Sequence, residues 1–462
     1  MRNDVSIVIL AGGLGTRMKS RRAKVLHCAG GDTLVGHAVN TALVCAPPER
    51  IFVVVGHQAG QVQQAVADRG VEFIQQTEQK GTGHAVLCGR EQLEANGGLV
   101  AIINGDCPLV RPATIEGLIN RQAASDAGGT LISTRLDDPT GYGRIIRDTD
   151  GNVQAVVEHK AATEKQRQVN EINAGFYCFR ADLFWKHAGE ICPDNPANEY
   201  YITDMVEILI RAGHRVQPFF IEDSAELLGI NTRVELAAVD RVFRERTTRD
   251  LMLAGVTIER PETVTIDPCV EIGMDTVIEP FARILGQTRI GENCRIGAHS
   301  IVGDSLLEDE VEVAPFSSIA SSRLDRGSHV GPFARLRMES HVEPQGSVGN
   351  FVELKKTRLG AGSKAQHLAY LGDSTIGEKS NIGAGTITCN YDGIKKSPTR
   401  IGDRAFIGSN STLVAPVEIG TGAYVGAGSV ITDAVPEDAL ALGRERQVVK
   451  PGWAKARREK QK

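Results

Sequence analysis

The apolar positions in the first half of the chain form short runs that alternate with stretches of helical spacing. Residues 7–10 (IVIL), 51–56 (IFVVVG) and 99–105 (LVAIING) fit buried strands, whereas residues 59–70 (AGQVQQAVADRG) show a helical pattern. This alternation predicts βαβ units around a mostly parallel sheet. Ligands of such sheets bind beyond the carboxyl ends of the strands, where the loops AGGLGTRM (11–18) and GDCPL (105–109) are expected.

The pattern changes between Asn231 and about Val256, where apolar residues at helical spacing are mixed with many charges. This stretch predicts a connecting helix. We therefore expect an α/β domain over residues 1–230, a linker helix over 231–256 and a repeat domain over 257–462.

The second half follows a period of six residues. Branched aliphatic residues recur at this spacing in three series that begin at Ile266, Leu324 and Ile401, and glycine often follows the aliphatic residue. The period predicts a hexapeptide β-solenoid, in which each unit is one short strand and a turn, and three units make a coil with a stacked aliphatic interior. A polar insertion between Thr388 and Arg400 interrupts the repeat and is expected to project as a loop.

Composition narrows the function classes. The chain has 462 residues, of which 41% are hydrophobic and 24% charged, as expected for two or three globular domains. The net charge of −5 offers no broad cationic field, so we expect no nucleic-acid or membrane partner. The nine scattered cysteines include no C-x-x-C, which argues against a disulfide framework or a zinc site. Without a signal peptide or membrane-spanning stretch, the chain is predicted to be cytoplasmic, and its basic end (KARREKQK) a solvated tail.

The glycine loop after the first strand suits phosphate groups. A Walker A motif is absent, and a G-x-G-x-x-G motif fails because residue 18 is methionine. What remains is a loop of exposed backbone N–H groups followed by Arg17 and Lys24, which suits a triphosphate. Asp106 could serve as a metal ligand or cap a helix, and Asn231 could be a ligand or simply begin the linker helix.

Six segments occur in the order found in the sugar-nucleotide pyrophosphorylases, which the first half strongly resembles. They are LAGGLGTRM, QQTEQKGTGHA, GDCPL, GYGRI, VEHKAAT and INAG. The second half resembles the left-handed parallel β-helix of hexapeptide acyltransferases. As a whole, the chain resembles the bifunctional N-acetylglucosamine-1-phosphate uridyltransferases and glucosamine-1-phosphate acetyltransferases. The implied fold is a Rossmann-like nucleotidyltransferase domain followed by a left-handed β-helix.

The resemblance implies a uridyltransferase site at the glycine loop. Arg17 and Lys24 would act on the phosphates of UTP, while Asp106 and Asn231 would hold Mg²⁺. The groups expected to bind the nucleotide and the amino sugar are Leu10, Gly13, Lys24, Gln76, Gly81, Thr82, Gly143, Glu158, Asn173 and Asn231, with Gln76, Gly81 and Thr82 on the uracil. No protein base is needed, because the attacking sugar phosphate is already anionic at neutral pH.

The resemblance also implies an acetyltransferase site on the solenoid. The ammonium form of glucosamine-1-phosphate cannot attack the thioester of acetyl-CoA, so a base is required, and His367 lies at the family's base position. Glu353 would assist it. The expected sugar-phosphate ligands are Arg337, Lys355, Tyr370, Asn381 and Lys396. The expected acetyl-CoA contacts are Ala384, Asn390, Tyr391, Ser409, Ala427 and Arg444. The family forms these pockets between subunits, which implies a homotrimer.

Two alternatives remain open from the sequence. One is a pyrophosphorylase with a single activity, whose solenoid only regulates or oligomerises. The other is a scaffold or exchange-factor subunit that has kept both folds without the chemistry. The presence of His367, Asn390 and Lys396 argues against the first, and the presence of Arg17, Lys24 and Asp106 argues against the second.

Overall fold

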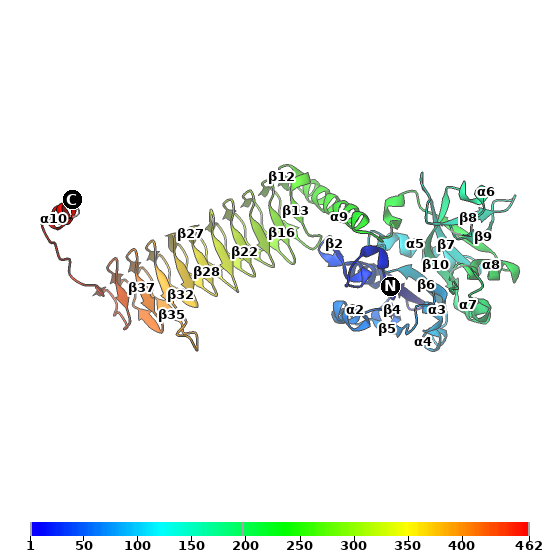
Figure 1. The fold of residues 1–462 in the computed structure, drawn as a ribbon, viewed down its shortest axis with the longest axis horizontal. Helices are drawn as coiled ribbons and strands as arrows, with labels where there is room; N and C mark the ends of the chain where they lie inside the picture. The colour runs from blue at the N-terminus through cyan, green and yellow to red at the C-terminus, as the bar shows by residue number, and fades with distance from the viewer. Residues whose placement is uncertain (1, 160, 196–197, 461–462) are drawn as a thin grey trace. The chain divides into compact units, whose positions relative to one another are not determined.

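The computed structural model describes residues 2–159, 161–195 and 198–460. The chain divides into two units, Met1–Phe243 and Arg244–Lys462 (Figure 1). A mixed, mostly parallel sheet forms the centre of the first unit. Its strands run in the order β11-β7-β10-β6-β1-β4-β5, and β10 is antiparallel to both of its neighbours β6 and β7. A hairpin of β8 and β9 attaches to β10. The strand bounds are Val5–Leu10 (β1), Ile51–Val55 (β4), Glu72–Gln75 (β5), Leu99–Asn104 (β6), Gly129–Arg135 (β7), Gly143–Arg147 (β8), Val153–Val157 (β9), Glu171–Arg180 (β10) and Val216–Phe220 (β11).

Both faces of this sheet are covered, which explains why its central strands are continuous apolar runs. Ile7 and Ile9 of β1 belong to the core on one face, and Val8 belongs to the core on the other. The helices of residues 34–211 are Leu34–Cys45 (α1), Ala59–Ala65 (α2), Thr82–Leu87 (α3), Arg90–Glu94 (α4), Pro112–Ala123 (α5), Glu164–Arg167 (α6), Ala181–His187 (α7) and Asp204–Arg211 (α8), and α6 buries none of its residues. A small ribbon pairs Cys28–Ala29 (β2) with Asp32–Thr33 (β3).

The long helix α9 (Arg233–Leu253) lies within the stretch predicted as a linker helix. A short helix, α10 (Trp453–Glu459), lies in the basic tail. Among the described residues, no helix is both long enough and apolar enough to span a bilayer.

Three parallel sheets make up the solenoid of the second unit, and each coil adds one strand to each sheet. The first sheet holds Thr257–Ile258 (β12), Val277–Ile278 (β15), Arg295–Ile296 (β18), Glu312–Val313 (β21), His329–Val330 (β24), Ser347–Asn350 (β27), Lys364–His367 (β30), Asn381–Ile382 (β33), Phe406–Ile407 (β36), Tyr424–Val425 (β39) and Leu440–Ala441 (β41). The second holds Thr265–Ile266 (β13), Arg283–Leu285 (β16), Ile301–Gly303 (β19), Ser318–Ala320 (β22), Arg335–Arg337 (β25), Glu353–Lys355 (β28), Tyr370–Gly372 (β31), Ile387–Cys389 (β34), Thr412–Val414 (β37) and Val430–Ile431 (β40). The third holds Glu271–Ile272 (β14), Arg289–Ile290 (β17), Leu306–Leu307 (β20), Arg323–Leu324 (β23), His341–Val342 (β26), Arg358–Leu359 (β29), Ser374–Ile376 (β32), Thr399–Ile401 (β35) and Val417–Ile419 (β38).

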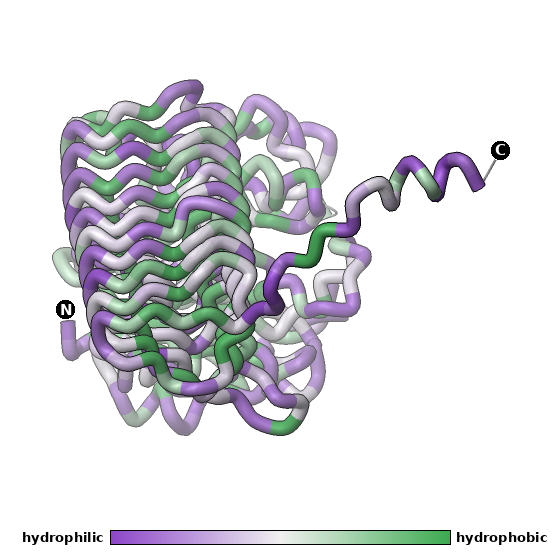
Figure 2. The backbone as a smooth tube through the Cα atoms, turned by 90° about the vertical axis from the view of Figure 1, so that its left-hand side faces the viewer, coloured by the Kyte–Doolittle hydropathy of each residue, from purple (hydrophilic) through white to green (hydrophobic). Residues whose placement is uncertain are grey.

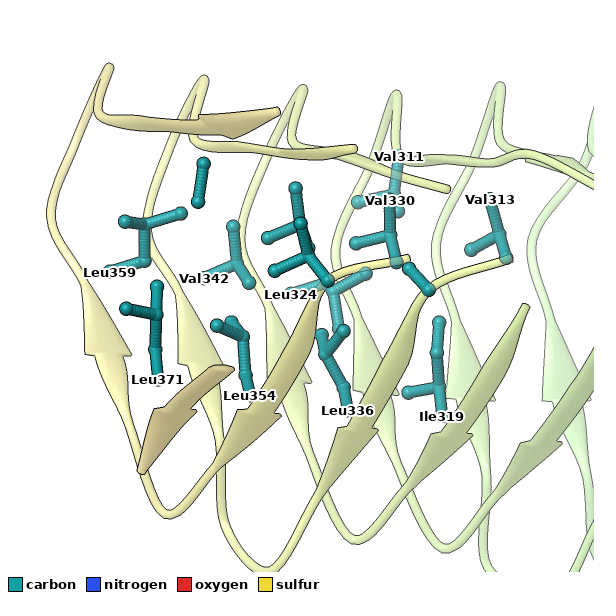
Figure 3. Packing of buried hydrophobic residues seen from close by; sticks show 14 of the residues in the cluster. Val311, Val313, Ile319, Leu324, Val330, Leu336, Val342, Leu354, Leu359 and Leu371 are labelled. Carbon is teal, nitrogen blue, oxygen red and sulfur yellow. The ribbon is translucent and has the colours of Figure 1, made fainter. Parts of the chain in front are cut away.

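In most strands an aliphatic residue points into the solenoid and stacks on its equivalents in the neighbouring coils, whereas β34 buries Thr388 and exposes Ile387. Ile319 pairs in register with Leu336, which in turn pairs with Leu354, and all three side chains are buried (Figure 3). Figure 2 shows the coils of the solenoid stacked regularly, one behind another. The predicted six-residue period is therefore the period of the core.

Aromatic rings stack along one corner of the solenoid. Phe281, His299, Phe316, Phe333 and Phe351 follow one another at centroid distances of 4.8–5.4 Å. All five have positive φ, between 56° and 63°, a backbone region that non-glycine residues rarely adopt. Stacking on the ring of the next coil offsets part of this strain at each corner.

Candidate active sites

A cavity of about 480 Å³ opens at the carboxyl ends of β1 and β6, at the edge predicted for ligand binding. It brings together eight of the predicted residues, namely Leu10, Gly13, Lys24, Gln76, Gly81, Thr82, Asp106 and Glu158. Residues not predicted also line it, among them Asn104, Glu199 and Tyr201. Asn104 directly precedes GDCPL at the end of a strand, which is a signal that sequence reasoning could have used.

The glycine loop is tied to the sheet at its start and closes into a tight turn at its end. Ala11 donates to the carbonyl of Val54 (3.0 Å), and Gly15, with φ of 59°, begins the turn over residues 16–18. A Cβ on Gly15 would lie 2.6 Å from the Cβ of Lys24, so glycine is required there. The loop therefore lies directly against the lysine that is predicted to meet the phosphates.

Two oxygen atoms converge on the ammonium group of Lys24. The Lys24 Nζ donates to Asp106 Oδ2 and to Asn231 Oδ1, the latter at 3.2 Å, and Arg17 Nη2 donates to the same Asn231 oxygen at 2.8 Å. The amide of Ile230 donates to the carbonyl of Asp106 at 3.0 Å, which ties the two loops together. The structure thus places the predicted phosphate and metal residues in one cluster, although Arg17 and Asn231 do not line the cavity itself.

A carboxylate at the start of α9 fixes the backbone on both sides of Asn231. Glu235 Oε2 accepts from the amide of Asn231 (2.6 Å) and from the amide of Thr232 (2.7 Å). The Thr232 hydroxyl accepts from the amide of Glu235 at 3.3 Å, which completes a capping box. Sequence analysis did not identify Glu235, although the spacing T-x-x-E is a recognisable signal for this cap.

The predicted amino-sugar residues meet at the junction of β8, β9 and β10. Gly143 pairs with Asn173 across β8 and β10, and a Cβ on Gly143 would lie 3.6 Å from Glu158 Oε1. Asn173 Nδ2 donates to the hydroxyl of Tyr177 at 2.6 Å, which orients the asparagine. Burial and the charge of Asp204 raise the pKa of Glu158. Burial and the charge of Glu207 raise the pKa of Asp204 to about 6.

On the solenoid, the predicted cations Lys355 and Lys396 lie near one carboxylate, Asp373, that sequence analysis did not identify. Lys355 Nζ donates to Asp373 Oδ2 at 3.2 Å, and Asn390 Nδ2 donates to the same oxygen. Lys355 pairs in register with Arg337. Contact with the ammonium of Lys355 lowers the pKa of Lys396, and Arg337 adds to this effect. A cluster with this excess of positive charge suits a phosphate monoester.

The predicted base, His367, lies at the end of β30, next to a corner of the solenoid. Its Nδ1 lies 2.6 Å from Asn350 Oδ1, and the two residues pair in register across β27 and β30. Because an amide oxygen can only accept, Nδ1 carries the proton and Nε2 is left with its lone pair. Tyr370 lies beyond the corner, in the next sheet. There its hydroxyl lies 2.6 Å from the place of a Cβ on Gly372, next to Asn390.

The predicted acetyl-CoA residues follow one another along the solenoid. The backbone N–H of Asn410 donates to the carbonyl of Ala384 (2.7 Å), and the backbone N–H of Gly428 donates to the carbonyl of Ser409 (2.8 Å). Ala384, Ser409 and Ala427 therefore recur once per coil. A Cβ on Gly428, which follows Ala427, would lie 4.0 Å from Arg444 Cδ.

The remaining predicted ligands are spread over the insertion and one strand. In the insertion, Tyr391 is exposed and bridges to Lys396. Asn381 lies in β33, one coil after Lys364. Glu353, the proposed helper of the base, instead accepts from Arg337 Nε at 2.7 Å.

Comparison with protein families identifies the class of each unit. Residues 7–164 match the MobA-like NTP transferase domain, residues 269–304 match the bacterial transferase hexapeptide (six repeats), and residues 398–433 match the hexapeptide repeat of succinyl-transferase. The fold and sites thus define a nucleotidyltransferase joined to a hexapeptide transferase, and the predicted fold class is confirmed.

Curated relatives narrow the class to one family. The chain is 62% identical over 459 residues to the bifunctional protein GlmU of Solibacter usitatus, covering 99% of this chain and 98% of that protein. It is 46% identical over 460 residues to the bifunctional protein GlmU of Koribacter versatilis, with the same coverage. The chain belongs to the bifunctional GlmU family. The predicted family and the predicted bifunctional enzyme are confirmed, and the single-activity and scaffold alternatives are set aside.

Proposed function

We propose that the two sites carry out the last two steps of UDP-N-acetylglucosamine synthesis. The solenoid site transfers an acetyl group from acetyl-CoA to glucosamine-1-phosphate. The cavity of the first unit then transfers a uridylyl group from UTP to N-acetylglucosamine-1-phosphate and releases pyrophosphate. The observation that carries this proposal is the cluster of Arg17, Lys24, Asp106 and Asn231 at the edge of a cavity beyond the sheet.

In uridylyl transfer the protein positions and neutralises charge. The phosphate oxygen of the sugar attacks the α-phosphorus of UTP, and pyrophosphate leaves in line. Lys24 and Arg17 stabilise negative charge on the phosphates, and the glycine loop adds backbone N–H donors. Gln76, Gly81 and Thr82 hold the uracil, while Gly143, Glu158 and Asn173 hold the amino sugar. Leu10 and Gly13, which line the same cavity, contact the nucleotide.

The residues around Lys24 fit a divalent metal. Asp106 and Asn231 offer a carboxylate and an amide oxygen that already converge on one cation, and hard oxygen ligands suit Mg²⁺. Among the described residues, no group of three His, Cys, Asp or Glu side chains could hold a metal, so phosphate oxygens and water would complete the shell. When bound, Mg²⁺ would neutralise charge on the phosphates.

In acetyl transfer His367 removes a proton from the sugar ammonium through Nε2, and the free amine attacks the thioester. The amide C–N bond forms as the C–S bond breaks, and CoA leaves as its thiol. Arg337, Lys355 and Lys396 hold the sugar phosphate, with Tyr370 and Asn381 on the sugar. Asn390 and Tyr391 line the acetyl pocket, and Ala384, Ser409, Ala427 and Arg444 carry the rest of acetyl-CoA along the coils.

We also keep as proposals the domain division at residues 230 and 256, a homotrimer and the cytoplasmic location.

Paired single variants test this division of labour. Asp106→Ala should lower uridylyl transfer by at least about 100-fold, because one ligand of the charge-neutralising cluster is lost, and should leave acetyl transfer at the parent rate. His367→Ala should lower acetyl transfer by about 10²- to 10⁴-fold and leave uridylyl transfer unchanged. Each purified variant is assayed for both reactions, so that the unaffected activity reports on folding. Loss of both activities in a folded variant would contradict the assignment.

A further inference from the structure

The side-chain amide of Gln76 lies between the carbonyl of Gly81 and the imidazole of His84. Gln76 is 5% exposed, follows β5 and lines the cavity. Its Nε2 donates to the carbonyl of Gly81 at 3.1 Å and lies 3.3 Å from His84 Nδ1 in α3. A carbonyl can only accept, so the atom facing Gly81 is the amide nitrogen. The facing Nδ1 of His84 must then accept as well, and the imidazole carries its proton on Nε2.

This arrangement leaves the amide oxygen of Gln76 on the cavity side. Oε1 lies 2.8 Å from the place a Cβ on Gly12 would occupy, and Gly12 lines the same cavity. Within residues 2–159, 161–195 and 198–460, no group donates a hydrogen bond to Oε1. This oxygen is also not fully buried. The cavity therefore presents a free acceptor at this point.

Two hydrogen bonds anchor the residues just before His84, and Cys88 and Tyr200 flank its ring. Gly83 donates its amide to the carbonyl of Tyr200 (2.8 Å), and Thr82 Oγ1 accepts from the amide of Ile202 (3.1 Å). The Cys88 Sγ lies 3.8 Å from both ring nitrogens, and the ring centroid of Tyr200 lies 6.0 Å away.

We propose that His84 is a positioning residue that makes the nucleotide site select uracil over cytosine. Uracil carries a donor at N3, which matches the acceptor Oε1, whereas cytosine carries a lone pair at N3, which Oε1 repels. A flipped amide would present its NH₂ group and reverse this preference. A flip would turn Oε1 towards the carbonyl of Gly81, and it would also require the proton of His84 to move from Nε2 to Nδ1. This inference rests on the proposed use of UTP and adds the group that enforces it.

The test compares UTP with CTP in variants of the full chain. His84→Leu removes the acceptor, and we expect the ratio of kcat/KM for UTP to that for CTP to fall at least about tenfold, chiefly through a higher KM for UTP. His84→Asn can place an amide oxygen near the position of Nδ1 and should keep the ratio within about threefold of the parent. Cys88→Ala removes the thiol beside the ring and is the matched control, with an unchanged ratio.

An unchanged ratio in His84→Leu would overturn the inference, as would an equal loss in His84→Asn and His84→Leu. If His84→Leu does not fold, His84→Phe keeps the ring volume without the acceptor and is read in the same way. A parent enzyme that does not use UTP at all would refute the proposed function instead, and this outcome is seen before any variant is made.

Discussion

Single side chains near the amino-sugar residues carry a pH dependence that the fold imposes. Asp204 begins α8, and burial raises its pKa to about 6, with a further contribution from Glu207. A carboxyl group whose pKa is higher in the folded than in the unfolded chain keeps its proton longer when folded. Its contribution to stability is therefore greatest at low pH and falls as the pH rises from about 4 to about 6.

Asp204→Asn removes this dependence, because an amide does not ionise. We expect the variant to be more stable than the parent above pH 6, with a difference that shrinks towards pH 4. Urea unfolding followed by the fluorescence of the buried Trp185 measures this at pH 4.5 and pH 8. Asp126→Asn, at a side chain that is 95% exposed, is the control and should show no such trend. A gain that is equal at both pH values would contradict the assignment.

At the residue scale, the sequence predicts the groups that lie in motifs better than the groups that support them. Lys24 and Asp106 were predicted from short segments and do meet in the structure. The supporting groups contact residues that are distant in the sequence. His84 contacts Gln76, 8 positions away. Asn350 contacts His367 and Asp373 contacts Asn390, each 17 positions away. Such contacts depend on strand register and on a loop's return path, neither of which local patterns determine.

At the scale of the element, the N-terminal cap of helix α9 positions a proposed metal ligand, because Glu235 holds the backbone of Asn231. Glu235→Ala removes the acceptor of two backbone amides and should cost about 0.5–2 kcal/mol of stability. The Asn231 oxygen should then be less well placed, so that half-maximal uridylyl transfer requires several-fold more Mg²⁺. Rates measured across a Mg²⁺ titration provide the readout.

The controls for this cap use the same chain. Glu235→Gln keeps an accepting oxygen and should largely restore the Mg²⁺ dependence. Gln166→Ala breaks the capping box of α6, which contains none of the proposed metal ligands, and should leave that dependence unchanged. If Glu235→Ala shifts stability alone, Glu235 is only a helix cap.

Elements with a strong local period were predictable, and those defined by distant pairing were not. The central strands of the sheet and the repeating strands of the solenoid follow directly from apolar runs and the six-residue spacing. The reversed direction of β10 and the attachment of the β8–β9 hairpin do not, because they depend on partners about 30 to 80 residues away. Part of the proposed amino-sugar site is built at that junction.

At the scale of the whole molecule, the solenoid is stabilised by contacts between neighbouring coils. Ile319→Ala in β22 should cost about 2–5 kcal/mol, because it leaves a cavity between stacked aliphatic layers. Acetyl transfer should then be lost at a lower temperature than in the parent. Ser318→Ala, on the outward face of the same strand, is the matched control. Heat-inactivation curves of acetyl transfer compare the three proteins, and equal midpoints for Ile319→Ala and the parent would contradict the expectation.

The coil-by-coil construction of the solenoid also governs how it can change over evolutionary time. A gene duplication that copies a complete coil adds a layer that makes the same contacts as the existing coils. The solenoid can therefore lengthen without a new kind of interaction. A deletion of one residue inside a strand would instead turn the following side chains inside out as far as the next corner. The insertion between Thr388 and Arg400 escapes this penalty because it leaves the wall after one strand and returns at the start of another.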